Sequence, residues 1–357
     1  MKQLSAVLIT IIVTTYINSD AETGNIDNVI WLFKPVFDDA RDISEGLAAV
    51  KKDGKWGYIN KKGKFVIEPQ FEDALDFQEG LAAVQKGGEW GFINSEGKMI
   101  ITPRFENAYY FSEGLAKIKK TGMYGYVNND GRIISEPQFD DAAGFCDGLA
   151  VVKKDGKWGY INKYGKIIIS PRFDYAYCFH EGLAAVKKDK NWGYINTGGK
   201  TVIEFQFSDV ESFSEGLAAV YKDKKCGFID KKGKFVVEPR FTWKKDFSED
   251  MAAVKKDGMW GYIDKTGRIV IEPQFDNAYN FYGGLAVVAK NEKRGFINKK
   301  GTIIKEHQFD YVYNFSEELA AVKKNGMYGY INKECNIVIE PCFVETGDFF
   351  EGIARVR

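Results

Sequence analysis

The feature that most constrains this chain is a Trp-Gly step that recurs with a fixed period of 34 residues. Tryptophan fills the first position of the step in five copies, and another residue fills it in four. The nine positions are Trp56, Trp90, Tyr124, Trp158, Trp192, Cys226, Trp260, Arg294 and Tyr328. A period of this length without insertions is typical of an array of one small structural unit that packs against its neighbours in sequence.

Each repeat contains three apolar segments separated by turn residues. In one copy the three segments are residues 47–50, 56–60 and 64–69. Asp53 and Gly54 accept the positive φ angles of a two-residue hairpin turn, and Asn60 and Gly63 suit the second turn. No segment of the chain indicates a helix longer than about two turns. The pattern predicts an all-β protein built from three-stranded β-meanders.

The third segment is apolar at successive positions, as in Phe65, Val66 and Ile67. A strand with one face in water would alternate instead, so we expect each meander to be covered on both faces. Two phenylalanines recur in the segment that connects one meander to the next, at Phe71 and Phe77 in this copy. We expect this segment to pack onto the sheet and the neighbouring meander to cover the opposite face.

The number of strands bears on whether the array is open or closed. The Trp-Gly strand occurs nine times, whereas the strands before and after it each occur ten times. A ring closed by its first and last strands would therefore have one sheet without a middle strand, and propeller blades usually have four strands. We favour an open superhelical array of 34-residue three-stranded β-meanders, with a closed propeller-like ring as the alternative.

The N-terminus has the features of an export signal. Lys2 precedes an apolar run over residues 4–13, and small residues follow at positions 19–21. The run is too short to span a membrane comfortably. We predict a signal peptide over residues 1–21 and therefore a secreted or periplasmic protein. A polar lead-in over 22–29 then precedes the repeat array over 30–357, which starts with a half-unit over 30–50 and continues with nine units.

The repeated motif resembles that of the WG-repeat (or KWG-repeat) family of bacterial proteins. The residues that carry the resemblance are Lys-Trp-Gly-Tyr-Ile-Asn at 55–60, a Pro and a Phe about ten residues later, and Phe-x-Glu-Gly-Leu-Ala before the next copy. The resemblance implies an array of β-repeats that is often exported. It implies no catalytic residue and no cofactor.

Composition argues against several classes of function. The chain has 50 basic and 50 acidic residues without a long block of one sign, which gives no reason to expect a nucleic acid as partner. His180 and His307 are the only histidines, and no metal-ligand spacing, phosphate loop or nucleophile motif is present. We predict a protein that is not an enzyme and needs no cofactor or metal. A carboxylate precedes the Gly-Leu-Ala step in nearly every copy, as at Glu181, and we interpret it as a structural group that holds the backbone of the loop.

Binding surfaces on repeat proteins usually lie where the repeats differ. Here the variable positions precede the second phenylalanine of the connecting segment, where tyrosine is frequent: Tyr109, Tyr110, Tyr177, Tyr279 and Tyr313. Tyrosine offers contact area and a hydroxyl group at low entropic cost. We predict these tyrosines as a candidate binding surface for another protein, with a solvated loop as the alternative.

The aromatic residues of the Trp-Gly step allow two interpretations. Either they pack between repeats as framework residues, or they form a ladder of exposed rings that stack on sugars. We favour the framework interpretation for Trp56, Trp90, Tyr124, Trp158, Trp192, Trp260 and Tyr328. The chain is therefore predicted to be an exported, non-enzymatic scaffold that binds a protein, and the alternative is a glycan- or cell-wall-binding protein that uses this series.

Five cysteines are present, none of them in a Cys-x-x-Cys pattern. Cys146 and Cys178 lie in comparable segments of neighbouring repeats, so they could approach one another. We favour the interpretation that each is a separate local substitution, because Cys226 and Cys335 replace the usual Trp and Gly of their positions.

Overall fold

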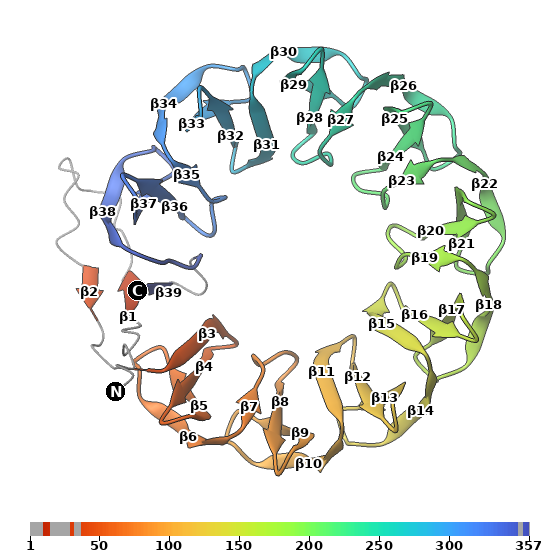
Figure 1. Cartoon of the computed structure of the whole chain (residues 1–357), viewed down its shortest axis with the longest axis vertical. Helices are drawn as coiled ribbons and strands as arrows, with labels where there is room; N and C mark the ends of the chain where they lie inside the picture. The colour runs from red at the N-terminus through yellow and green to blue at the C-terminus, as the bar shows by residue number, and fades with distance from the viewer. Residues whose placement is uncertain (1–9, 15–28, 32–36, 349–352, 357) are drawn as a thin grey trace, which may run out of the picture. The chain divides into compact units, whose positions relative to one another are not determined.

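The computed structural model describes residues 10–14, 29–31, 37–348 and 353–356. Within these ranges the chain forms strands and no helix, so no helix there is long and apolar enough to cross a membrane. The predicted all-β repeat fold is therefore confirmed, and none of the described sheets closes into a barrel. The open arrangement of the array stays a prediction, as does its closed alternative. Contacts divide the chain into two compact units, each described separately below (Figure 1).

Unit 1 takes in Met1–Tyr110, Lys293–Gly295 and Ile304–Arg357. Its described residues contain three four-stranded antiparallel sheets, each made by one repeat. The strands are β3 (Asp39–Ser44), β4 (Leu47–Lys52), β5 (Lys55–Asn60) and β6 (Phe65–Phe71); β7 (Asp73–Ala74), β8 (Leu81–Lys86), β9 (Glu89–Asn94) and β10 (Met99–Phe105); and β35 (Tyr311–Val312), β36 (Leu319–Lys324), β37 (Met327–Asn332) and β38 (Ile337–Phe343).

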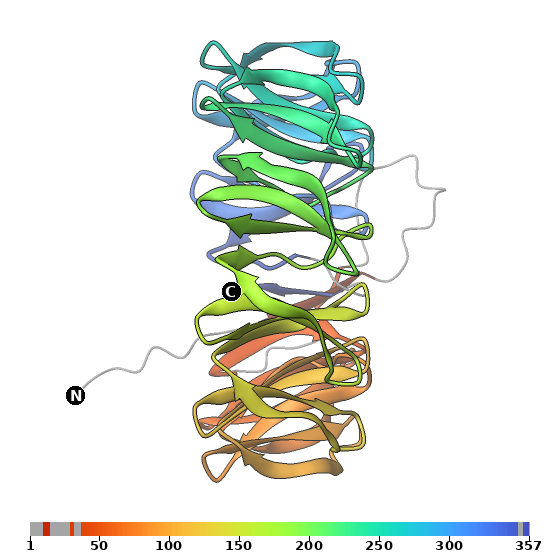
Figure 2. The same ribbon diagram turned by 90° about the vertical axis from the view of Figure 1, so that its right-hand side faces the viewer.

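Unit 2 takes in Phe111–Glu292 and Phe296–Ile303. Four complete sheets of the same kind follow one another in it, drawn from yellow-green to blue-green in Figure 1 and seen from the side in Figure 2. Their strands are β15 (Asp141–Cys146), β16 (Leu149–Lys154), β17 (Lys157–Asn162) and β18 (Ile167–Phe173); β19 (Tyr175–Ala176), β20 (Leu183–Lys188), β21 (Asn191–Asn196) and β22 (Thr201–Phe207); β23 (Asp209–Val210), β24 (Leu217–Lys222), β25 (Lys225–Asp230) and β26 (Phe235–Phe241); and β27 (Trp243–Lys244), β28 (Met251–Lys256), β29 (Met259–Asp264) and β30 (Ile269–Phe275).

Unit 2 also holds five further strands. They are β12 (Leu115–Lys120), β13 (Met123–Asn128), β14 (Ile133–Phe139), β31 (Asn277–Tyr282) and β32 (Leu285–Lys290). Three strands contain residues of both units: β11 (Asn107–Ser112), β33 (Lys293–Asn298) and β34 (Ile303–Phe309).

Each four-stranded sheet has one strand more than the sequence predicted. The additional strand comes from the start of the connecting segment and pairs with the Leu-Ala-Ala-Val strand, as Ala176 does with Val186. The prediction of three strands was wrong because the connecting segment carries no alternating apolar pattern. Its backbone groups are nevertheless paired, as buried backbone groups must be. The Tyr177 N–H donates to the Ala185 carbonyl at 2.9 Å just beyond the end of this strand.

The glycine of the Trp-Gly step is required by a close approach of two strands. A Cβ atom on Gly193 would lie 2.6 Å from the carbonyl oxygen of Ile203 on β22. The pairing of β21 with β22 is irregular on both sides of Tyr194, where the register shifts. The step therefore combines a large ring with a residue that has no side chain, because the bulged strand β22 crosses directly over that glycine.

The core lies between consecutive sheets. In unit 2 one buried cluster joins Trp192 and Tyr194 of one sheet to Val210, Ala218 and Ile229 of the next. The expectation that a neighbouring meander covers each sheet is therefore confirmed.

The expectation that the third strand is covered on both faces was wrong. Ile203 of β22 is buried, but Val202 beside it is 40% exposed. The side chain of Val202 therefore lies partly in solvent, so this face of β22 is not fully covered. Continuous apolar sequence here marks a strand with one face buried and the other partly exposed.

The predicted signal peptide includes one described segment. Thr10–Thr14 form β1, which pairs with β2 (Val29–Trp31) and with β39 (Ile353–Val356) in unit 1. The remainder of the signal peptide, the lead-in over 22–28 and residues 32–36 of the half-unit lie outside the described residues. Since cleavage after residue 21 would remove β1, this segment cannot be both a cleaved signal peptide and a strand of the mature protein.

Candidate functional site

Most tryptophans of the Trp-Gly step are buried. Trp56, Trp90, Trp192 and Trp260 are all buried, and Trp56 belongs to a cluster that includes residues of the following sheet. Trp158, Tyr124 and Tyr328 are half-buried. The burial of these four rings agrees with the framework interpretation, which stays a prediction. These four rings do not form a ladder of exposed rings that could stack on sugars.

A second aromatic residue in most repeats fixes the connecting segment. The hydroxyl group of Tyr194 donates to the carbonyl of Glu211 at 2.7 Å, and that of Tyr160 donates to the carbonyl of Tyr177 at 2.8 Å. Burial raises the pKa of Tyr194 far above its ordinary value, so the hydroxyl stays protonated as this bond requires. The hydroxyl group of Tyr160, in the preceding repeat, thus fixes the position of Tyr177 on the connecting segment.

Four rings from two consecutive repeats meet in unit 2. We call Trp158, Tyr175, Tyr177 and Trp192 the aromatic cluster. The ring of Tyr177 stacks on Trp192 with 5.1 Å between centroids and 8° between planes. Tyr175 lies 5.6 Å from Trp158, 5.5 Å from Tyr177 and 5.9 Å from Trp192. Tyr175 and Tyr177 are 45% and 38% exposed, whereas Trp192 is 5% exposed, so buried tryptophan supports exposed tyrosine.

Lysines surround the aromatic cluster. The Lys153 ammonium lies 5.7 Å from the centroid of Trp158, and the Lys187 ammonium lies 5.6 Å from that of Trp192. Lys187 is also the direct cross-strand partner of Tyr175. Burial raises the pKa of Tyr177, and the negative charge of Asp209 raises it further. The cluster therefore presents the neutral hydroxyl group of Tyr177 and ring edges beside positive charge, which suits an acidic, partly apolar ligand.

The same arrangement recurs in unit 1, four repeats later. Tyr311 and Tyr313 lie 4.9 Å apart, and Tyr313 lies 6.2 Å from Tyr328. The guanidinium of Arg294, which replaces tryptophan, sits 3.9 Å from the centroid of Tyr311. Lys323 lies over Tyr328 at 4.8 Å. An arginine can thus take the tryptophan position and still support the exposed tyrosine.

The other predicted tyrosines lie apart from these clusters. Tyr110 is 38% exposed, and its hydroxyl group donates to Asp76 at 3.4 Å. Burial raises the pKa of Tyr110, and the charge of Asp76 adds to the effect. Tyr109 and Tyr279 are half-buried and receive hydrogen bonds from asparagine side chains two residues earlier. Of the five predicted residues, the structure brings Tyr177 and Tyr313 into aromatic clusters.

Sequence reasoning missed a second series of exposed aromatic residues. Trp243 is 62% exposed, and it occupies the same repeat position as Tyr175 and Tyr311. In six other repeats an Asp or Asn fills that position: Asp39, Asp73, Asn107, Asp141, Asp209 and Asn277. There the side chain accepts a hydrogen bond from the next backbone N–H, as Asp209 does from Val210 at 3.0 Å. The sequence did contain a signal for them, since an aromatic residue replaces the usual Asp or Asn three times, at intervals of two repeats.

The recurrent carboxylates join one repeat to the next. Glu113 accepts from the Gly148 N–H at 3.0 Å, and Glu249 accepts from the Gly284 N–H at 3.1 Å. Each of these glutamates also forms an ion pair with a lysine. Glu113, for example, pairs with Lys163 at 3.0 Å. These bonds agree with the structural interpretation of the series.

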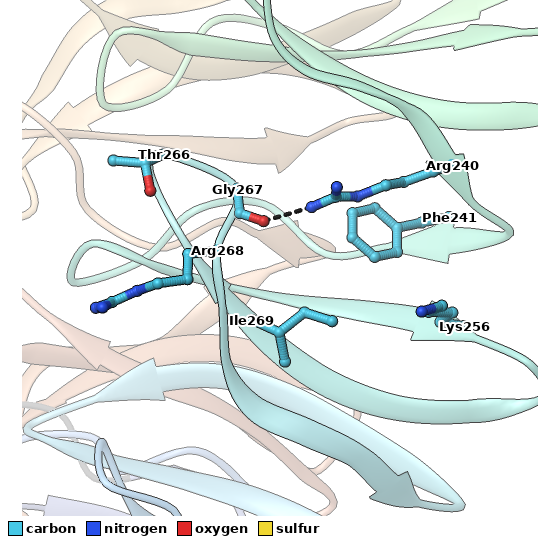
Figure 3. A pocket seen from close by; sticks show the side chains of 7 residues that line it. All are labelled: Arg240, Phe241, Lys256, Thr266, Gly267, Arg268 and Ile269. Atoms are coloured by element: carbon cyan, nitrogen blue, oxygen red, sulfur yellow. Dashed lines mark hydrogen bonds between the residues drawn. The ribbon is translucent and has the colours of Figure 1, made fainter.

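A shallow pocket of about 550 Å³ lies between two sheets of unit 2. Figure 3 shows Arg240 of β26 reaching the carbonyl oxygen of Gly267, while the guanidinium of Arg268 points away from Arg240 and Lys256. Arg268 is itself paired with Asp264 at 3.2 Å. The pocket contains none of the predicted residues. Its Arg240 joins adjacent repeats, as Arg172 does by donating to Gly199 at 2.7 Å.

Among the residues that the structure describes, no group of three His, Cys, Asp or Glu side chains could hold a metal ion. His180 is exposed, and its backbone pairs with Leu183.

Comparison with known proteins bears on the fold and on the repeat. A family model described as "WG containing repeat" matches the chain ten times, at residues 31–56, 56–90, 90–124, 124–158, 158–192, 192–226, 227–260, 260–293, 295–328 and 328–357. No curated protein matches the chain.

Two solved structures illustrate the likeness of fold. A structure titled "Crystal structure of the eukaryotic initiation factor" is 13% identical with a TM-score of 0.54, and the match covers 88% of this chain and 98% of that one. The Kluyveromyces lactis Hsv2p structure is 12% identical with a TM-score of 0.35, over 63% of this chain and 91% of that one. The first match supports the fold and carries no function.

Proposed function

Because the chain belongs to the WG-repeat family, we propose that it is an exported, non-enzymatic repeat protein whose connecting segments bind another protein. The burial of four tryptophans supports the view that the framework positions of the repeats serve the core. The residues of the additional strand and those after it can therefore differ between repeats without disturbing the core. A repeat array that displays variable side chains from a constant frame is a common basis for protein recognition.

The observation that carries the proposal is the aromatic replacement at Tyr175, Trp243 and Tyr311. Each ring replaces a capping Asp or Asn and so gives up a local hydrogen bond. Each ring also stands directly across the strand pair from a lysine: Lys187, Lys255 and Lys323, respectively. The fold needs none of these rings, since six repeats form without one. Exposed Trp and Tyr beside a cation are the side chains that most often anchor protein interfaces.

Glycan or cell-wall binding is the second candidate, and Trp243 favours it. A ring that is 62% exposed leaves flat apolar surface free for a sugar. The aromatic cluster favours a protein instead, because Tyr177 and Trp192 already use ring faces to stack on each other. Absence of catalysis is supported by the recurrent carboxylates, which are committed to structural bonds.

Co-sedimentation separates the two candidates. The purified protein is incubated with whole cell envelope, with protein-stripped cell-wall polymer, or with buffer alone. We expect it to sediment with the intact envelope and to stay in solution with the stripped polymer. Sedimentation with the stripped polymer would overturn protein binding in favour of the glycan.

The matched variants are Tyr175→Asp and Trp243→Asp, which restore the residue that other repeats use. Both should fold normally, because Asp can accept the capping hydrogen bond that Asp209 accepts. We expect both to lose binding. Binding equal to that of the unchanged protein in both variants would contradict the proposed surface.

Export has its own test. Expression of the full chain with its N-terminus intact, followed by fractionation and intact-mass analysis, should give an extracytoplasmic protein that starts near Glu22. Recovery of the complete chain in the cytoplasm would instead agree with the placement of β1 between β2 and β39.

A further inference from the structure

Cys146 and Cys178 lie against each other across two consecutive repeats of unit 2. Cys146 is the last residue of β15, and Cys178 follows the two-residue strand β19 in the next repeat. In the preceding pair of repeats the equivalent positions are Ser112 and Gly144, and a Cβ atom on Gly144 would lie 3.8 Å from the Cβ of Ser112, a separation that suits a disulfide. Both side chains are half-buried, and neither takes part in a disulfide in this structure. The sequence interpretation that favoured two unrelated substitutions does not account for this contact.

The repeat itself explains why the two residues meet. In other repeats the position of Cys146 is a serine whose hydroxyl donates to a carbonyl 33 residues later. Ser112 donates to Phe145 at 2.8 Å, and Ser248 donates to Phe281 at 2.7 Å. The equivalent carbonyl for Cys146 belongs to Phe179, the residue directly after Cys178. A side chain at position 146 therefore already spans the joint between two repeats.

The segment that carries Cys178 is held in place from two sides. The carbonyl of Tyr177, immediately before it, accepts from the Tyr160 hydroxyl at 2.8 Å, and the Tyr177 N–H donates to Ala185 at 2.9 Å. Burial raises the pKa of the Cys178 thiol to about 12, and the neighbouring Cys146 thiol adds to this effect. In the reduced state the Cys178 thiol is thus protonated at neutral pH.

We propose that Cys146 and Cys178 form a reversible disulfide that links the two repeats which build the aromatic cluster. The oxidant is a small-molecule disulfide such as glutathione disulfide. One protein thiolate attacks a sulfur of the oxidant, which forms a mixed disulfide and releases one thiolate. The second protein thiolate then attacks the protein sulfur of that mixed disulfide, forms the Cys146–Cys178 bond and releases the second thiolate. The two protein thiols lose two protons and two electrons, and the oxidant becomes two thiols.

The consequence is a link next to the proposed binding surface. Tyr177 directly precedes Cys178, so the bond fixes one edge of the aromatic cluster to the repeat before it. Loop closure in the unfolded chain is also restricted, which stabilises the folded state. The other cysteines provide internal references: Cys226 and Cys335 are buried, and Cys342 is exposed.

The test counts thiols in the full-length chain. After incubation with glutathione disulfide, the protein is denatured, alkylated and weighed. We expect alkylation of three of the five cysteines, without a glutathione adduct, and a peptide map that joins residues 146 and 178. The midpoint of thermal unfolding should rise by several degrees on oxidation and return when a dithiol is added.

Cys146→Ser is the decisive control variant. Serine is the usual residue at this position and can donate to the Phe179 carbonyl as Ser112 does to Phe145. The variant should fold, keep its remaining four thiols after oxidation, and show no rise in unfolding temperature. Cys342→Ser should still form the linked peptide. Five free thiols in the oxidised protein, or stable glutathione adducts without a link, would overturn the proposal.

Discussion

The carboxylate of Glu181 accepts the backbone N–H of Gly216 at 3.1 Å, from a turn 35 residues further along the chain. The same carboxylate pairs with Lys231 at 3.0 Å. Glu181 adopts a φ of 53°, an uncommon angle for a glutamate, in a two-residue turn with Gly182. Asn or Asp would suit that turn better, but the longer glutamate reaches the next repeat. The repeat therefore accepts local strain for a bond between neighbours.

Glu181→Gln should destabilise the protein by about 1 kcal/mol at neutral pH, because a charged acceptor is replaced by a weaker one. Burial raises the pKa of Glu181, but the hydrogen bonds from Lys231 and Gly216 outweigh it and lower the pKa below 4.5. A lowered pKa in the folded state means that the contribution is complete above pH 4.5 and is lost as the pH falls through the folded value. Urea unfolding at pH 7 and at pH 3 measures the difference. A gap between the two proteins that is unchanged at pH 3 would refute the carboxylate's role.

Trp192→Ala should cost about 3–5 kcal/mol, since it removes a buried ring from the joint between two sheets. Trp243→Ala is the matched control, because its ring is 62% exposed and should change stability by no more than about 0.5 kcal/mol. Denaturant unfolding of the two variants under identical conditions provides the comparison. Equal losses would contradict the distinction between framework and surface rings.

Tyr194→Phe should destabilise the protein by about 1 kcal/mol, because the carbonyl of Glu211 would be left without its hydroxyl donor. Packing should survive, since Phe228 occupies the same position in the next repeat and is equally buried. Tyr164→Phe serves as the control at a ring that is 88% exposed. The relevant observation is the unfolding midpoint, and no difference between the variants would show that the bond contributes nothing.

Gly193→Ala should cost about 1–3 kcal/mol through steric overlap. Its new Cβ would meet the backbone oxygen of Ile203 at 2.6 Å, and backbone cannot rotate away as a side chain can. Gly198→Ala offers the contrast, because the nearest atom to its Cβ is 3.5 Å away on the Asn196 side chain. Thermal unfolding of both variants tests the assignment. Similar midpoints would mean that the Trp-Gly step has room for a side chain.

The sequence by itself determined the repeat, its period, the all-β class and the hairpin turns. These follow from local rules: Asp-Gly and Asn-x-x-Gly select turns, and a strict 34-residue spacing fixes equivalent positions. It also favoured a framework role for the aromatic residue at Trp192. Equivalence between repeats made that inference possible, because a residue needed in every copy serves the fold.

Only the tertiary structure decided which surfaces are free. The additional strand at Tyr175 has no apolar alternation, because its pairing is set by the partner strand rather than by its own side chains. The exposure of Val202 could not be predicted either, since it depends on what packs over that face of the strand. Cys146 and Cys178 meet because successive repeats stack with a fixed offset. Such contacts join residues 32 positions apart, and no local pattern in the chain encodes how two sheets approach.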